Sequence, residues 1–141
     1  MDAVVNCAGA LQNSSNDSVY GVHARGAVTL YEVCQSKGLR RIVHLSAAGV
    51  EAKRSAFSQS KLAGDQWLLA SDLDWTILRP SVVVGNSAFG GSALLRGLAA
   101  LPFTPDFRNA GKLQLMHLED VADTVAICVQ KSIESRQMLE L

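Results

Sequence analysis

The sequence contains no apolar run long enough to cross a membrane. A membrane-spanning helix needs roughly 18 to 20 consecutive apolar residues. The longest candidate, residues 92–101, is interrupted by Arg96 and Gly97. The sequence begins with Met1 and Asp2 and shows neither the basic region nor the long apolar core of a signal peptide. We therefore expect a cytoplasmic protein that has no membrane partner.

Net charge and paired cysteines are also absent. The chain has 13 acidic and 13 basic side chains, so no excess of positive charge supports binding to nucleic-acid phosphates. No Cys-x-x-Cys pair occurs, and the apolar surroundings of Cys7, Cys34 and Cys128 predict buried thiols in a reducing compartment. His23 and His117 lack metal-ligand spacing with each other or with Cys7, so we expect no metal site.

The residues that are present predict one α/β domain over residues 1–141. Apolar residues make up 48% of the chain and charged residues 18%, which suits a globular domain with a single core. Apolar runs predict buried strands, and helical spacing or a capping residue predicts helices. The expected strands are 3–9, 41–46, 75–78, 113–116 and 137–141, and the expected helices are 24–36, 56–71, 92–101 and 120–131. This alternation is typical of a parallel sheet between two layers of helices.

Two segments, residues 55–61 and 74–85, resemble the short-chain dehydrogenase/reductase family. In that family a Tyr stands four residues before an active-site Lys on a helix, and the next strand ends in a Leu-Arg-Pro-type loop. Here Lys61 and the run Leu78-Arg79-Pro80 occupy those places. Further family-like motifs follow in order at 5–9, 23–26, 41–47 and 117–122. The sequence of residues 73–81 most resembles the atypical branch of the family. This branch includes bacterial sugar-nucleotide-epimerase-like proteins and an accessory subunit of respiratory complex I.

The resemblance implies a doubly wound, Rossmann-like sheet, NAD(P) as cofactor, and roles for individual residues. The catalytic positions fall on Ser46 and Lys61, although the register leaves open whether Ala47 takes the place of the active Ser. The implied cofactor-binding residues are Ala8, Gly9, Lys61, Pro80, Val82 and Val83. The Tyr position holds Phe57, whose ring has no proton to deliver to a carbonyl oxygen during hydride transfer. We therefore expect no dehydrogenase activity.

The family's opening strand, its Gly-x-x-Gly-x-x-Gly loop and the helix after it have no counterpart in this sequence. That loop lets the backbone approach a pyrophosphate and aims a helix N-terminus at its charge. We therefore expect a truncated domain that lacks the first βαβαβ unit and binds NAD(P) weakly or not at all. Residues 3–7 would then form an exposed sheet edge. A two-fold contact would cover it, so we expect a homodimer, or a higher assembly built from dimers, through Met1–Leu11 and the helix at 24–36. The domain would then persist as a homo-oligomer or an interaction module.

Other interpretations remain open. In one alternative, this chain is part of an NAD(P)-dependent reductase or epimerase, and another chain supplies the missing part. In the other alternative, the domain senses NAD(P) without turnover. Several residues also have simpler explanations. Lys61 is also explained as an exposed helix lysine, His44 as a core histidine, Trp67 as a packing residue, and the Glu119-Asp120 pair as a helix cap.

Overall fold

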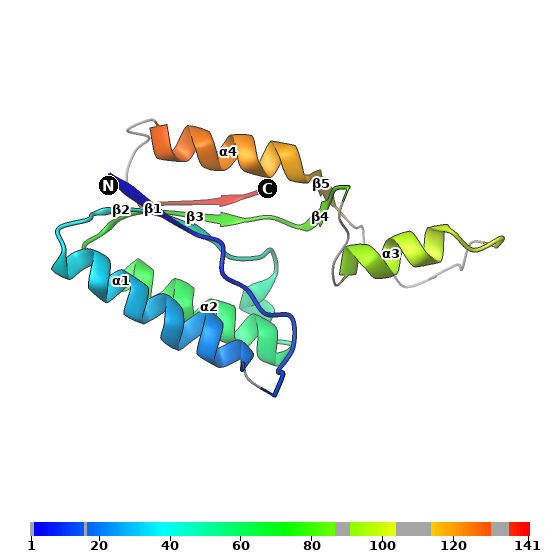
Figure 1. The fold of residues 1–141 in the computed structure, drawn as a ribbon, viewed down its shortest axis with the longest axis horizontal. Helices are drawn as coiled ribbons and strands as arrows, with labels where there is room; N and C mark the ends of the chain where they lie inside the picture. Colours follow the sequence, from blue (N-terminus) through cyan, green and yellow to red (C-terminus); the bar gives the residue numbers. More distant parts are fainter. Residues whose placement is uncertain (1, 16, 87–90, 104–113, 131–135) are drawn as a thin grey trace.

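The computed structural model describes residues 2–15, 17–86, 91–103, 114–130 and 136–141. Its elements in chain order are β1 (Ala3–Asn6), the π-helix η1 (Gly21–Gly26), α1 (Ala27–Ser36), β2 (Arg41–Leu45), the 3-10 helix η2 (Val50–Ala52), α2 (Ala56–Ala70), β3 (Asp74–Arg79), β4 (Val82–Val84), α3 (Gly91–Ala99), β5 (Leu115–His117), α4 (Leu118–Gln130) and β6 (Gln137–Glu140). Figure 1 shows the main sheet between α1 and α2 on one face and α4 on the other. The predicted α/β architecture is confirmed.

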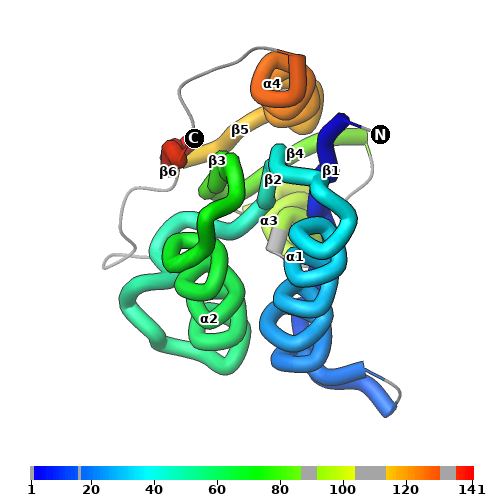
Figure 2. Tube along the Cα trace, turned by 90° about the vertical axis from the view of Figure 1, so that its left-hand side faces the viewer, coloured from blue at the N-terminus to red at the C-terminus, as the bar shows by residue number. Residues whose placement is uncertain are grey.

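The main sheet has four strands in the order β1-β2-β3-β6, and every neighbouring pair is parallel. The chain runs from β1 through α1 to β2, and from β2 through α2 to β3. The two helices pack side by side on the same face of the sheet (Figure 2). Parallel strands bring their carboxyl ends to one edge, so the loops that follow β1, β2 and β3 meet there. This edge carries the candidate site.

The two central strands, β2 and β3, carry apolar residues on both faces because each strand lies between two cores. Ile42 and Ile77 belong to the core beneath α1 and α2. The residues that follow them, Val43 and Leu78, belong to the core that includes Cys128 of α4. Successive side chains of a strand point to opposite faces, and here both faces are covered. The absence of polar alternation in these two strands follows directly.

Local sequence signals set the end of α1 and the start of α2. Gly38 adopts a left-handed backbone conformation with φ of 74° just after α1, as the Lys37-Gly38 pair predicts. The helix α2 begins with a capping box, in which the side chains of Ser55 and Ser58 each bond the other residue's backbone N–H. These signals set the crossover geometry that places Lys61 beneath the sheet edge.

Several predicted boundaries are corrected. The strand β1 ends at Asn6, because the amide of Ala8 turns back to donate a hydrogen bond to Asn6 Oδ1 at 3.1 Å. The helix expected at 24–36 starts earlier, with the π-helical segment from Gly21. α4 starts at Leu118, so Asp120 lies in its first turn and does not cap it.

Two further expectations are wrong. The resemblance implies a loop from Pro80 through Val82 and Val83, but Val82 and Val83 form β4, which pairs in parallel with β5 in a separate two-stranded sheet. The thiol of Cys7 was expected to be buried, but it is exposed where the chain leaves β1, whereas Cys34 and Cys128 are buried. The predicted strand at 113–116 and helix at 120–131 each include one end residue outside the described ranges.

The expected edge position of β1 is confirmed. Its neighbour is β2, and no other strand among the described residues pairs with it. Val5, in the middle of this strand, keeps 39% of its surface exposed. Within the described ranges, no helix combines the length and the apolar character needed to span a bilayer.

Candidate functional site

Lys61 lies beneath the carboxyl ends of β1 and β2. Its side chain is only 5% exposed. Its ammonium donates hydrogen bonds to the carbonyl of Leu45 at 2.8 Å and to that of Ala8 at 3.3 Å. Burial lowers the pKa of Lys61, and the nearby charge of Asp65 partly opposes this effect. The interpretation as an exposed helix lysine is therefore wrong: this is a buried cation that joins the exits of two strands.

Ala8 and Gly9, two of the predicted cofactor-binding residues, lie next to this ammonium. Both are exposed. A Cβ atom added to Gly9 would come within 4.0 Å of Lys61 Nζ and 3.7 Å of His23 Nε2, so the Gly9 backbone passes close to both side chains. The structure thus brings Ala8, Gly9 and Lys61 together, as the resemblance implies.

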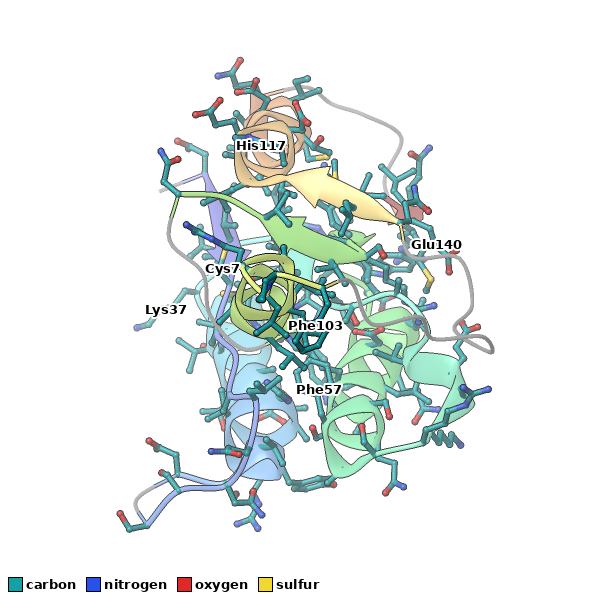
Figure 3. The ribbon with its side chains drawn as sticks, turned by 90° about the vertical axis from the view of Figure 1, so that its right-hand side faces the viewer. Cys7, Lys37, Phe57, Phe103, His117 and Glu140 are labelled. Carbon is teal, nitrogen blue, oxygen red and sulfur yellow. The ribbon has the colours of Figure 1, made fainter. Side chains whose placement is uncertain are left out.

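Phe57 stands in the first turn of α2, one turn before Lys61, and lies between α1 and α2 in the view of Figure 3. Its ring is partly buried and packs edge-on against the imidazole of His23, with the ring centroids 5.1 Å apart. The position therefore offers an apolar surface. A phenol at residue 57 would add an O–H donor there, which the native phenyl ring does not provide.

His23 connects three elements around this site. Its Nδ1 lies 2.9 Å from Ser60 Oγ on α2, and its Nε2 accepts a hydrogen bond from the amide of Ala10 at 2.9 Å. Burial, followed by the charges of Lys61 and His44, lowers the pKa of His23 from 6.5 to about 4. At neutral pH this imidazole is therefore uncharged and acts through its hydrogen bonds.

Ser46, the predicted catalytic serine, is bonded to the interior. Its hydroxyl donates to Asp65 Oδ2 at 2.8 Å, and both side chains are buried. The guanidinium of Arg79 donates to the same carboxylate oxygen, with its Nη2 at 3.0 Å. His44 Nε2 lies 3.2 Å from Asp65 Oδ1, a close polar contact that does not have the geometry of a regular hydrogen bond. Ser46 thus serves a buried polar cluster, and its hydroxyl is occupied.

The charge of this buried cluster is set by its partners. Burial alone would raise the pKa of Asp65, but contacts with His44, Ser46 and Arg79 outweigh it and lower the pKa. Burial opposes the charge of Arg79, yet Glu51 and Asp65 raise its pKa above the usual range. Asp65 and Arg79 therefore stay charged together inside the protein. Neither residue has a sequence pattern that marks it as part of a cluster, although Asp65 lies one helical turn after Lys61.

The remaining predicted cofactor-binding residues lie in other contacts. Pro80 is buried, and its carbonyl accepts a hydrogen bond from the amide of Ala48 at 3.0 Å. Val82 and Val83 are half-buried in β4, opposite Leu115 and Met116 of β5. The structure therefore gives these three residues roles in strand ends and pairing.

A cavity of about 470 Å³ lies beside the same β1 exit loop. Its lining includes Asn6, Ala8, Gly21 and Gly26, so the β1 exit and the π-helix form its walls. Asn6 is fixed there by a 3.0 Å hydrogen bond from its Nδ2 to the hydroxyl of Tyr31. Ala8 thus belongs to both the Lys61 site and the cavity wall.

Comparison with known proteins agrees with this geometry. Residues 1–132 match the model of the NAD(P)H-binding family. The chain therefore belongs to this family of NAD(P)H-binding proteins, and the resemblance to NAD(P)-binding Rossmann proteins is confirmed. Relatives include a ceramide reductase from Caulobacter vibrioides, 27% identical over 128 residues. Another is the mitochondrial NADH dehydrogenase [ubiquinone] 1 alpha subcomplex subunit 9 of Dictyostelium discoideum, 25% identical over 123 residues.

Solved structures share the fold at low sequence identity. The enzyme WbmG of Bordetella bronchiseptica, in complex with NAD and UDP, superposes with a TM-score of 0.75 at 17% identity over 99% of this chain and 49% of that chain. The dTDP-4-dehydrorhamnose reductase of Bacillus anthracis, in complex with NADP, gives a TM-score of 0.70 at 14% identity over 99% of this chain and 55% of that chain.

The chain spans only part of these proteins. The alignment with the ceramide reductase includes 90% of this chain but only 40% of that protein. For the NADH dehydrogenase subunit the shares are 86% of this chain and 34% of the relative. The activities in these names therefore belong to proteins of which this chain spans less than half.

Proposed function

We propose that this chain provides the nicotinamide-facing part of an NAD(P)-binding domain, binds the dinucleotide weakly by itself, and does not reduce carbonyl groups. The observation that carries the proposal is the buried ammonium of Lys61. Two backbone carbonyls hold it, and no carboxylate among the described residues lies within ion-pair distance of it. A buried cation of this kind is expected to have a polar ligand.

The residues of the site fit one half of a dinucleotide. Lys61 has three N–H donors, of which two reach carbonyls. Among the residues that the structure describes, this leaves the third donor for a hydroxyl such as that of a ribose. The exposed backbone at Gly9 lies within contact distance of the same ammonium. The sequence has no Gly-x-x-Gly-x-x-Gly loop for the pyrophosphate. The fit therefore covers the nicotinamide side and leaves the diphosphate without its usual backbone donors, which is the reason to expect weak binding.

Proton transfer is the missing part of the chemistry. A bound nicotinamide would supply a hydride, but reduction of a carbonyl also needs a proton donor at the developing alkoxide. Phe57 has none, and the hydroxyl of Ser46 is bonded to Asp65 in the interior. These residues support a binding role and argue against turnover.

The proposal is tested by titrating the purified chain with NADH and NADPH in a calorimeter, alongside two lysine variants. We expect millimolar binding to the native chain and to Lys37→Met, whose lysine is exposed at the end of α1. Lys61→Met keeps a side chain of similar length without the charge, and should bind at least tenfold more weakly. Micromolar affinity, or equal affinity for Lys61→Met, would contradict the proposal.

A separate assay addresses turnover. NADH oxidation with a panel of aldehydes and ketones should show no rate above background for the native chain. Phe57→Tyr restores the phenol at one turn from Lys61. Carbonyl reduction by the native protein would refute the assigned loss of the proton donor.

As a second candidate, the chain would be one part of an NAD(P)-dependent reductase or epimerase that another polypeptide completes, or it would be an NAD(P)-sensing domain. The preformed contacts of Lys61 favour NAD(P) binding in both cases, and the names of the reductase relatives favour the completed enzyme. In that case, adding the completing chain should raise the affinity for NAD(P) to the micromolar range. A sensor would bind without turnover, and a reductase would oxidise NADH in the completed state.

We also propose that the chain forms a homodimer through the free edge of β1 and the neighbouring surface of α1. The supporting observations are the edge position of β1 and the exposed apolar side chains Val5 and Val33. Unpaired backbone groups on an apolar edge favour pairing with a second strand. Light scattering at micromolar concentration should give twice the monomer mass, and Val5→Lys should halve it. A native chain that stays monomeric would exclude this assembly.

A further inference from the structure

The loop after β1 is held at two points by neighbouring residues of α2. Lys61 bonds the carbonyl of Ala8 directly at 3.3 Å. Ser60, the residue before it, reaches the same loop through His23, whose Nε2 accepts from the amide of Ala10. The exposed residue Gly9 lies between the two anchor points. The loop therefore has a direct anchor and an indirect anchor, which both originate in one turn of α2.

The hydrogen bonds determine which nitrogen of His23 carries the proton. The hydroxyl of Ser60 donates its only hydrogen to the carbonyl of Phe57 at 2.9 Å. Its oxygen must then accept from His23 Nδ1, 2.9 Å away. The other nitrogen, Nε2, is left with a lone pair, which is what the amide of Ala10 requires. The direction of each bond in this chain, from Ala10 through His23 to Ser60, is thereby fixed.

The backbone around His23 is built for this placement. His23 lies in the π-helix η1, whose wider turn differs from the α-helix that follows it. The carbonyl of His23 packs directly on Gly64 of α2, where any Cβ atom would collide with it. Only a glycine at residue 64 lets the two helices approach so closely. His23 is buried, at 2% exposure, and its Nε2 faces the loop, where it accepts from the amide of Ala10.

We propose that His23 is a positioning residue, which fixes the Ala8–Ala10 loop in the conformation that lines the Lys61 site. The assignment of nicotinamide as the ligand of this wall depends on the proposed function, but the positioning of the loop does not. His23 acts through the backbone of Ala10 and does not itself touch the ligand. Its neutral state at physiological pH keeps the Nε2 lone pair available to that amide.

Two variants separate positioning from space filling. Glutamine places an amide oxygen near the position of Nε2 and can accept from Ala10. Asparagine is shorter and reaches only the position of Nδ1 beside Ser60. For His23→Gln we expect the Ala10 amide to keep its slow hydrogen exchange in NMR spectra. For His23→Asn we expect exchange at least about tenfold faster, because the amide loses its buried partner. The affinity for NADH should follow the same order.

The native protein supplies a measurement that needs no variant. The nitrogen chemical shifts of the imidazole should report the tautomer with the proton on Nδ1. The opposite tautomer, a rapidly exchanging Ala10 amide in the native chain, or equal exchange in His23→Gln and His23→Asn would overturn the proposal. If the native chain binds no NADH while the exchange rates of the two variants still differ, the proposed function fails and His23 is supported as the anchor of the loop.

Discussion

Replacing Asp65 by Asn should destabilise the protein far more than replacing Asp74 by Asn. Asp65 is fully buried, and its carboxylate accepts hydrogen bonds from Ser46 and from two nitrogens of Arg79. Asn keeps the volume and one acceptor oxygen but removes the negative charge. The buried guanidinium of Arg79 is then left with Glu51, which is largely exposed.

The magnitude follows from the difference in burial. Removing one partner of a buried ion pair typically costs about 3 to 5 kcal/mol, and the retained acceptor of Asn favours the lower end, about 3 kcal/mol. Asp74 pairs with Arg41 at 2.8 Å but is 37% exposed. Arg41 also keeps its bonds to Thr76 Oγ1 and the carbonyl of Cys128. The loss of that half-exposed pair should cost less than about 1 kcal/mol.

Urea unfolding followed by tryptophan fluorescence measures both free energies of unfolding. A domain of 141 residues is expected to have a total stability of roughly 7 to 20 kcal/mol, so a loss of 3 kcal/mol moves the midpoint clearly. The slope of the transition should stay unchanged in both variants. If Asp65→Asn and Asp74→Asn lose equal stability, the buried cluster does not have the charge state assigned to it.

Two further predictions concern the anchor of the loop. Burial, followed by the charges of Lys61 and His44, lowers the pKa of His23 from 6.5 to about 4. The contribution of His23 to stability is therefore complete above pH 6.5 and falls by up to about 3 kcal/mol as the pH drops to about 4. His23→Gln should remove this part of the pH dependence of the free energy of unfolding, measured by urea titrations at several pH values. An unchanged pH dependence in His23→Gln would refute the prediction. Gly64→Ala should cost about 1 to 3 kcal/mol because its Cβ meets the carbonyl of His23, whereas Gly97→Ala, in open space on α3, should stabilise by about 0.5 to 1 kcal/mol; thermal unfolding distinguishes the two outcomes.

Much of the fold can be predicted from the sequence because the central strands are buried on both faces. The runs that contain Ile42 and Ile77 are apolar on both faces, and that pattern predicts buried parallel strands. The strand β4 escapes prediction, since Pro80 and Ser81 precede it as turn residues. Its partner β5 comes much later in the chain, and pairing over that distance leaves no local pattern.

The candidate site is predictable where it depends on spacing and not where it depends on packing. Lys61 is predicted as a site residue from its position four residues after Phe57. Its burial depends on the carbonyls of Ala8 and Leu45, which the fold brings together. The role of His23 depends on the π-helical turn and on the contact with Gly64. Neither feature has a sequence signature that would distinguish it from an ordinary helix start.

We propose above that a dinucleotide lies against the β1 exit loop beside Lys61. An NMR titration of the isotope-labelled chain with NADH tests this placement most directly. We expect the amide signals of Ala8, Gly9 and Ala10 to shift together and to saturate in the millimolar range. Signals that move only elsewhere in the protein, with these three amides unchanged at saturation, would contradict it.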